Sequence, residues 1–317
     1  MSLHKVITTR HGKACRQLLL AAALAALPFT AGPTDAKMYQ IPQTQAEKEA
    51  LLRALEAGEP DALYLVGALG IEGRVQDLSR DEGLAALFQA AESGHAEANY
   101  LLGVIYATGQ GQPRDPATAV QHLQLAASAG HARAQTALAQ AYLTGLGVAQ
   151  DAAQARQWLE QAVAGGERDA RVNLGVLLLS GDAGIQDPAR GIELLRVAAD
   201  QGVVAAQHNL GQAFAEGLGV APQPAAAVPW YRLAAEKGYQ RAQFALGRLL
   251  LSGNDPSFDP IEGVSWIMLA AAGPNQGLVE VASGVLSQLA EQLPQEILND
   301  ARERARVTMM RIGMNSR

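Results

Sequence analysis

Residues 95–130 read HAEANYLLGVIYATGQGQPRDPATAVQHLQLAASAG, and this stretch decides the fold. Apolar residues recur every third or fourth position in its first half and again in its second half, which predicts two amphipathic helices. The first stripe consists of Ala98, Leu102 and Tyr106, and the second of Ala119, Leu123, Ala126 and Ala127. The stretch is therefore predicted to form a helix-turn-helix hairpin.

The ends of the two helices carry their own signals. Gly109 is predicted to end the first helix, because glycine readily adopts the left-handed conformation found at helix C-termini. Asp115 and Pro116 are predicted to begin the second helix, the aspartate as N-cap and the proline at the first helical position. The same Asp-Pro signal returns at residues 187–188 and 259–260.

The pattern returns every 36 residues, and such self-similarity indicates a repeat architecture. Two columns of glycine have this spacing: Gly58, Gly94, Gly130, Gly166, Gly202 and Gly238, and Gly73, Gly109, Gly145, Gly181, Gly217 and Gly253. The repeats are predicted at 59–94, 95–130, 131–166, 167–202, 203–238 and 239–274.

The fold class follows from this period. The chain is predicted to be all-α, an α/α superhelical solenoid of about six helix-turn-helix repeats closed by capping helices. Residues 37–58 are expected to form a linker and an N-terminal capping helix, and residues 275–317 two C-terminal capping helices. The arginines of the last helix are expected on a solvated outer face: Arg302, Arg304, Arg306 and Arg311.

Small residues inside the helices predict close packing. A glycine in a helix interior costs about 1 kcal/mol relative to alanine, so the approach of a neighbouring helix must offset it. Such glycines stand at Gly67, Gly103, Gly175 and Gly211, and the alanine pairs at 90–91, 126–127, 198–199, 234–235 and 270–271 are expected at the same seam. The tryptophans at one repeat position, Trp158, Trp230 and Trp266, are expected in the core.

The first 36 residues are predicted to be a secretory signal. Four basic residues precede an uninterrupted apolar run at 18–27, and no acidic residue comes before Asp35. Cleavage is expected after Gly32 or Ala36; the alternatives are a disordered tail or a helix that docks elsewhere. The run is too short to span a bilayer, which needs about 20 apolar residues, and no other segment reaches that length uninterrupted.

Charge and cysteine content narrow the functional classes. The net charge of −6 argues against nucleic-acid binding, and cleavage after Ala36, which removes four basic residues and one acidic residue, would make it −9. The only cysteine, Cys15, precedes the apolar run, so disulfides, thiolate metal sites and lipid attachment are not expected in the mature chain.

Catalytic and cofactor motifs are missing from the sequence. His95 and His131 each stand first in a repeat, where a solvated or capping role is expected, since metal sites need three or four convergent ligands. No GxSxG, HExxH or phosphate-loop pattern occurs, and the Gly-Leu-Gly triplets at 145–147 and 217–219 are interpreted as turns. We therefore expect no catalytic residue, no metal and no cofactor.

The repeat resembles the Sel-one-like repeat, a relative of the tetratricopeptide repeat. The resemblance covers about 59–274 and is fullest in 95–130 and in AAQHNLGQAFAEGLGV with AAAVPWYRLAAEKG. It implies a right-handed superhelix with a concave groove, and a role as adaptor in protein complexes. One secreted, cysteine-rich subgroup implies instead a β-lactamase or penicillin-binding activity, but those proteins carry a disulfide in each repeat.

In the related tetratricopeptide repeat the first helix lines the concave face, which implies that repeat positions 3, 6, 10 and 13 point into the groove. The candidate partner-binding residues are Tyr64, Tyr100, Arg133, Gln140, His208, Gln212, Arg241, Phe244 and Arg248. A second interpretation stays open, in which rings such as Tyr100 and Phe244 only fill the space between first helices.

The sequence thus predicts an exported, non-catalytic scaffold, periplasmic or secreted, that binds a protein or peptide in its groove and has no nucleic-acid partner and no membrane span in the mature chain. Two other classes remain as hypotheses. A β-lactamase would need a pocket with a convergent base, and an RNA-binding repeat protein would need a basic groove.

Overall fold

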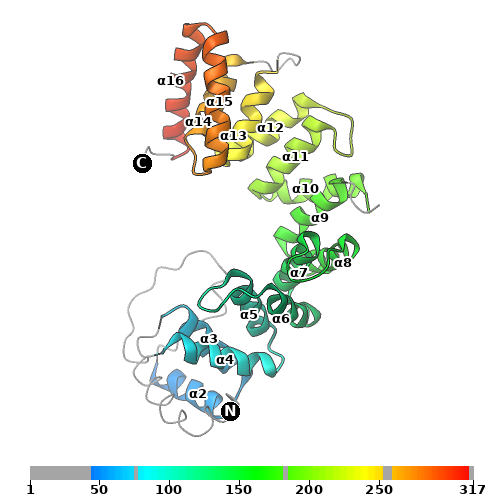
Figure 1. Ribbon diagram of the computed structural model, residues 1–317, viewed down its shortest axis with the longest axis vertical. Coiled ribbons are helices and arrows are strands. Elements are labelled where there is room, and N and C mark those ends of the chain that lie inside the picture. The colour runs from blue at the N-terminus through cyan, green and yellow to red at the C-terminus, as the bar shows by residue number, and fades with distance from the viewer. Residues whose placement is uncertain (1–43, 75–77, 181–184, 253–258, 314–317) are drawn as a thin grey trace. The chain divides into compact units, whose positions relative to one another are not determined.

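A computed structural model of the chain describes residues 44–74, 78–180, 185–252 and 259–313. The described residues form fifteen α-helices and no strand (Figure 1). The predicted all-α fold of helix-turn-helix repeats is confirmed. The predicted signal segment with its cleavage sites lies outside the described residues.

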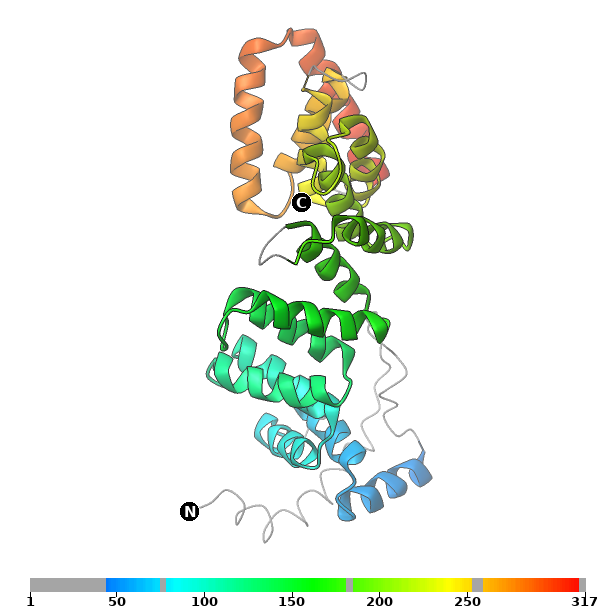
Figure 2. The ribbon, with the colours of Figure 1, turned by 90° about the vertical axis from the view of Figure 1, so that its right-hand side faces the viewer.

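The chain divides into two compact units, Met1–Gly165 and Gly166–Arg317. The helices of the first unit are α2 (Gln45–Glu56), α3 (Pro60–Ile71), α4 (Arg80–Glu92), α5 (Ala96–Thr108), α6 (Pro116–Ser128), α7 (Ala132–Thr144) and α8 (Ala152–Ala164). Helix α2 packs on α3, and the hairpins α3–α4, α5–α6 and α7–α8 stack one on the next (Figure 2).

The second unit continues the same arrangement. Its helices are α9 (Arg168–Ser180), α10 (Pro188–Asp200), α11 (Val204–Glu216), α12 (Pro224–Glu236), α13 (Gln240–Leu250), α14 (Pro260–Ala271), α15 (Gln276–Gln292) and α16 (Gln295–Arg311). Three hairpins, α9–α10, α11–α12 and α13–α14, stack in order, and α15 and α16 both pack against α14.

The predicted helix signals are confirmed. Gly109 ends α5 with a left-handed φ of 74°, and its N–H donates to the carbonyl of Ile105. Asp115 caps α6, because its Oδ1 accepts from the backbone N–H groups of Ala117 and Thr118 at 3.1 Å each. The boundaries of this hairpin are thus set by local chemistry before any packing is considered.

The mid-helix glycines lie against the second helix of their own repeat. A Cβ added to Gly103 would come within 2.8 Å of the Leu123 side chain, and one added to Gly211 within 2.7 Å of the Tyr231 ring. The paired alanines serve a different interface, since Ala90 and Ala91 cluster with Leu102 of the next repeat. The single seam expected from the sequence is therefore two seams, one inside each repeat and one between repeats.

The Gly-x-Gly loops are turns, as predicted, and they also join consecutive repeats. The second glycine has a left-handed φ of 77° at both Gly147 and Gly219. A Cβ at Gly147 would overlap the backbone of Pro116, and one at Gly219 would overlap Pro188. Each loop thus rests directly on the first turn of the preceding repeat's second helix, which is why a side chain is excluded there.

The tryptophan column is only partly core. Trp266 is 3% exposed, whereas Trp158 and Trp230 are half-buried and pack against the edge of the apolar clusters. The expectation of a core position is therefore confirmed for Trp266 alone.

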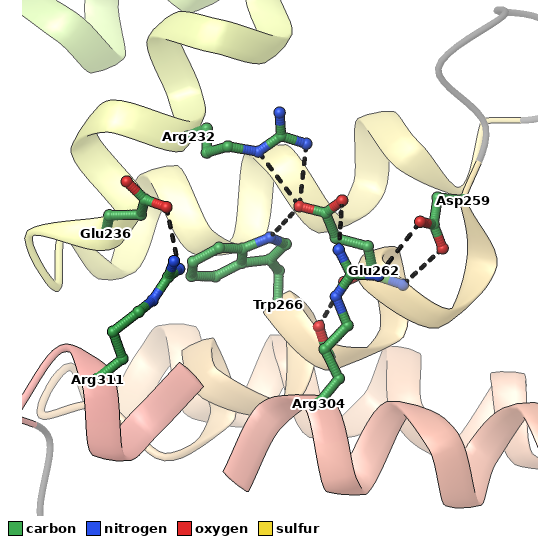
Figure 3. A network of polar contacts seen from close by, with 8 residues as sticks. Arg232, Glu236, Asp259, Glu262, Trp266, Arg304 and Arg311 are labelled. Carbon is green, nitrogen blue, oxygen red and sulfur yellow. Dashed lines mark hydrogen bonds and ion pairs between the residues drawn. The ribbon is translucent and has the colours of Figure 1, made fainter. Parts of the chain in front are cut away.

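Helix α16 is held to the repeats by ion pairs (Figure 3). The buried Glu262 accepts hydrogen bonds from Arg232 and from the Trp266 indole at 3.0 Å each, and its second oxygen pairs with Arg304 at 2.9 Å. Arg311 pairs with Glu236 of α12 at 3.0 Å.

All four arginines of the last helix are exposed, as expected. The sequence did not indicate that Arg304 and Arg311 also form ion pairs with other helices. Arg302 and Arg306 bond to Asn299 and Glu303 of their own helix. The pairs that hold Arg304 and Arg311 span 42 to 75 residues of chain, so the pattern of α16 alone could not indicate them.

Candidate partner-binding site

The predicted groove residues of the first unit include two tyrosines. The tyrosines at repeat position 6 contact the first residue of the following repeat: Tyr64 stacks on His95 and Tyr100 on His131, with ring centroids 4.6 Å apart in both pairs. Tyr64 is only 5% exposed. These rings therefore fill the junction between repeats, as the second interpretation of the sequence expects.

His131 makes three contacts at this junction. Its Nδ1 accepts the backbone N–H of Ala134 at 3.0 Å and so caps α7, and its Nε2 lies 2.6 Å from a carboxylate oxygen of Glu97. Because Nδ1 accepts a hydrogen bond, Nε2 is the ring nitrogen that donates to Glu97. Burial alone would raise the pKa of Glu97, but the hydrogen bond from His131 and the nearby charges of His131, Arg133 and His95 hold that pKa below its usual value.

His95 repeats the arrangement one junction earlier. Its Nδ1 accepts from the backbone N–H of Ala98 at 3.1 Å, and its Nε2 lies 3.1 Å from Asp61. The capping role expected for the two histidines is thus confirmed, and each also bonds a carboxylate at position 3 of the preceding repeat.

The second unit has the same ring pair with its members exchanged. His208 stands at position 6 of its repeat, and its ring lies 5.3 Å from that of Tyr239, the first residue of the next repeat. Its ring also lies 5.5 Å from that of Tyr231. Burial, with a smaller contribution from the positive charge of Arg241, lowers the pKa of His208 to about 4. His208 is therefore neutral near pH 7 and serves packing.

Phe244, at position 6 of the last repeat, packs at the edge of a cluster that contains Ile267 of α14 and Ala282 of α15. The guanidinium carbon of Arg248 lies 5.9 Å from the centre of its ring, within the range of a cation–π contact. Arg241 and Arg248 are both exposed on α13.

A column of buried amides at position 5 was missed by the sequence analysis. Gln135, Gln207 and Gln243 each donate from Nε2 to the carbonyl of the second alanine of the preceding alanine pair, at distances of 3.1–3.2 Å. Asn99 makes the equivalent bond to Ala91. The sequence did carry a signal for this column, because an amide recurs at a spacing of 36 residues next to the apolar stripe of the first helix. Polar groups in such a place are buried only when they are hydrogen-bonded.

The remaining predicted residues are less enclosed. Arg133 and Gln140 are exposed on α7, seven residues apart, and Gln212 of α11 donates to Glu216 at 3.1 Å. A cavity of about 240 Å³ lies between α5, α6 and α7, and Gln140 is one of its lining residues. Two other predicted inward positions, Val104 and Ala107, also line it.

The structure thus brings predicted residues together on one helix face and places a further one beside a cavity. In the first unit, Gln140 lies at the apolar cavity. In the second unit, Arg241, Phe244 and Arg248 share one face of α13, since they are spaced three to four residues apart. Among the described residues no three His, Cys, Asp or Glu side chains gather as metal ligands would. No described helix combines the length and apolarity that crossing a bilayer requires.

Comparison with known proteins assigns the family. The Sel1 repeat family matches residues 96–131, 132–167, 168–203, 204–239 and 240–275, each one residue after the start of a predicted repeat. The predicted repeat at 59–94 lies outside the matched residues. No curated protein matches the chain.

A solved structure shares the fold, and two others align with lower scores. A Sel1 repeat protein from Oxalobacter formigenes aligns with a TM-score of 0.63 at 24% identity, over 73% of this chain and 92% of that one. A Sel1 repeat protein from Klebsiella pneumoniae aligns with a TM-score of 0.45 at 25% identity, over 65% and 99% of the two chains. A protective antigen of uropathogenic Escherichia coli aligns with a TM-score of 0.47 at 22% identity, over 85% and 73%. With five matched repeats that cover more than half of its length, this chain belongs to the Sel1 repeat family.

Proposed function

We propose that the protein is an exported, non-catalytic scaffold that binds a protein or peptide partner along the face formed by the first helices of its repeats. Sel1 repeat proteins generally act as non-catalytic scaffolds for protein interactions. Export to the periplasm or beyond the cell is supported by the basic residues and apolar run that begin the sequence.

One observation carries the binding proposal. On the first helices α7 and α13, the side chains at repeat positions 3 and 10 are exposed, namely Arg133 and Gln140 on α7 and Arg241 and Arg248 on α13. The alanine and leucine stripes of the same helices are buried. Both helices therefore present long polar side chains two turns apart, on a face that repeat packing leaves exposed.

The cavity beside Gln140 supports the same proposal. Binding clefts in proteins are mostly apolar with few polar groups, and this cavity is lined chiefly by aliphatic side chains. Its volume of about 240 Å³ suits one large side chain of a partner better than a whole cofactor.

Site-specific photo-cross-linking in the native host tests the proposal. A photoreactive amino acid replaces Gln140, and in a matched control it replaces Gln121, an exposed glutamine on the second helix α6 of the same unit. We expect Gln140 to give a discrete adduct whose partner is identified by mass spectrometry and whose formation is reproduced with purified components. Equal adducts from both positions, or an adduct from Gln121 alone, would contradict the first-helix face.

A further inference from the structure

We infer that Arg241, Phe244 and Arg248 of α13, hereafter the arginine face, bind an acidic, extended segment of a partner protein. The inference rests on the proposed scaffold function and names the chemistry of its partner. It concerns the second unit only, where all three residues lie on one helix.

The geometry of the arginine face is simple. Arg241 and Arg248 are seven residues apart, which places their Cα atoms about 10 Å apart along one side of the helix, because an α-helix rises about 1.5 Å per residue. Phe244 lies between them and is anchored beneath by Ile267 and Ala282. The Arg248 guanidinium lies over its ring at 5.9 Å, so that this side chain is already partly ordered.

The two guanidinium groups are not neutralised within the described part of the chain. No ion pair there joins Arg241 or Arg248 to a carboxylate, whereas three other arginines of this unit are paired with carboxylates of other helices: Arg232 and Arg304 with Glu262, and Arg311 with Glu236. The arginine face is thus a positive site on a chain with a net charge of −6.

The charge of Arg241 affects the pKa of a neighbouring side chain, His208. The positive charge of Arg241 adds to burial in lowering the pKa of His208 on α11. His208 is consequently neutral near pH 7, and it contributes no charge of its own to the site.

The spacing indicates the form of the ligand. Arginine binds carboxylates through charge-assisted and often bidentate hydrogen bonds. In an extended polyproline II segment, residues i and i+3 project from the same side and lie about 9 Å apart. A segment with acidic residues at every third position therefore matches the spacing of the two arginines.

A protein segment fits this site better than a polyanion. Nucleic-acid affinity grows with the number of phosphates that are neutralised, and two arginines neutralise few. The acidic remainder of the chain repels an extended polyanion, whereas a short acidic segment needs only the arginine face.

Fluorescence anisotropy with the purified protein tests the inference. The probe is a labelled twelve-residue peptide with glutamate at every third position in an alanine and proline background, and the comparison peptide carries glutamine instead. We expect the glutamate peptide to bind at least tenfold more tightly than the glutamine peptide. The double variant Arg241→Glu with Arg248→Glu should lose at least tenfold in affinity with an unchanged melting temperature.

The matched control is Arg302→Glu with Arg306→Glu, because it makes the same change of charge on two exposed arginines of α16. Its affinity should stay within twofold of the wild type. Equal binding of the two peptides, or an equal loss in both double variants, would overturn the inference.

Two competition measurements distinguish the acidic segment from other ligands of the arginine face. Single-stranded polyuridylate and vesicles of phosphatidylglycerol should fail to displace the glutamate peptide at equal charge concentration. Displacement by either one would contradict the acidic segment as the ligand and would favour a polyanion or a lipid surface instead. A Gln140 adduct without peptide binding would reject this inference alone, whereas peptide binding without that adduct would reject the site at Gln140 and keep the arginine face.

Discussion

His208 shows how one residue position serves packing in several ways. Its place in the repeat is held by tyrosine in the first two repeats, and in all three cases the ring meets the first residue of the next repeat. Where tyrosine stands first in the next repeat, histidine stands at position 6, and where histidine stands first, tyrosine stands at position 6. These three junctions therefore share a pair of rings rather than one particular residue, whereas the two other junctions have Thr136 with Glu167 and Val172 with Val203 at the same positions.

The buried, neutral His208 predicts acid sensitivity. Its folded pKa of about 4 lies below the ordinary value of 6.5, so between these pH values the unfolded chain binds a proton that the folded chain does not. The contribution of neutral His208 to the free energy of unfolding is therefore fully present above pH 6.5 and is lost as the pH falls toward 4. At pH 4.5 the loss amounts to about 2 kcal/mol.

The variant His208→Phe keeps a ring at the junction and removes the titrating group. Urea unfolding at pH 7 and pH 4.5 should show that the variant loses about 2 kcal/mol less than the wild type on acidification. All other groups are the same in the two proteins, so their contributions cancel in the comparison. If the two proteins lost the same free energy of unfolding on acidification, His208 would be protonated without cost in the folded state.

Position 6 also marks the limit of sequence reasoning at this scale. The spacing of Tyr64, Tyr100 and His208 correctly placed them on the first helices, but it left a binding role and a filling role equally open. Their partners stand 31 residues further along the chain, and only the packing of one hairpin on the next brings the rings together. The exposed Arg241 and Arg248 needed no such partner, so their place on one helix face was predictable from spacing alone.

At the scale of helices, the alanine pairs set how closely consecutive hairpins approach. Ala127 and Ala235 are almost fully buried, and their carbonyls accept the side-chain amides of Gln135 and Gln243. A larger side chain would force the two hairpins apart and stretch these buried hydrogen bonds. The interface therefore resists enlargement for two separate reasons.

Replacement of Ala127 or Ala235 by leucine should destabilise the protein by about 1–3 kcal/mol through overpacking. The matched controls are Ala117→Leu and Ala225→Leu, which make the same change at exposed positions of the same two helices and should be nearly neutral. Urea unfolding gives the comparison, and hydrogen exchange should show the damage confined to neighbouring repeats. Unchanged stability in both buried variants would mean that these alanines do not limit the approach of the hairpins.

Helices outside the repeat period were less predictable than those inside it. The existence of α15 and α16 followed from their apolar patterns, but the anchoring of α16 depends on Glu262, a carboxylate buried on a different helix. Within the period, the same glycine, aspartate and alanine signals recur, and each recurrence confirms the last. A single capping helix offers only its own sequence, which does not show what it packs against.

At the scale of the whole molecule, each repeat contacts its neighbours within its own unit. The two units are each stabilised by successive hairpins. Stability in such a stack is the sum of repeat and interface contributions, and local damage does not unfold distant repeats. The first-helix faces can therefore vary while the interfaces stay constant.

Export is a prediction for the whole chain. The basic residues followed by the apolar run at 18–27 predict that protein isolated from the native host begins between Gly32 and Met38. Intact-mass measurement with N-terminal sequencing of a periplasmic or culture fraction provides the test. A cytosolic pool that retains Met1 would show that the segment is not a cleaved signal.

The ring pair at the junctions has a consequence for how such chains grow and shrink in evolution. Loss of residues 95–130 by unequal recombination would bring His131 onto Tyr64 and Asp61, which present to it the same kinds of group that Tyr100 and Glu97 present now. Loss of residues 203–238 would instead leave Tyr239 facing Val172, without an aromatic partner. The junction chemistry of the first unit thus survives the loss of residues 95–130, whereas the loss of residues 203–238 removes an aromatic pair from the second unit.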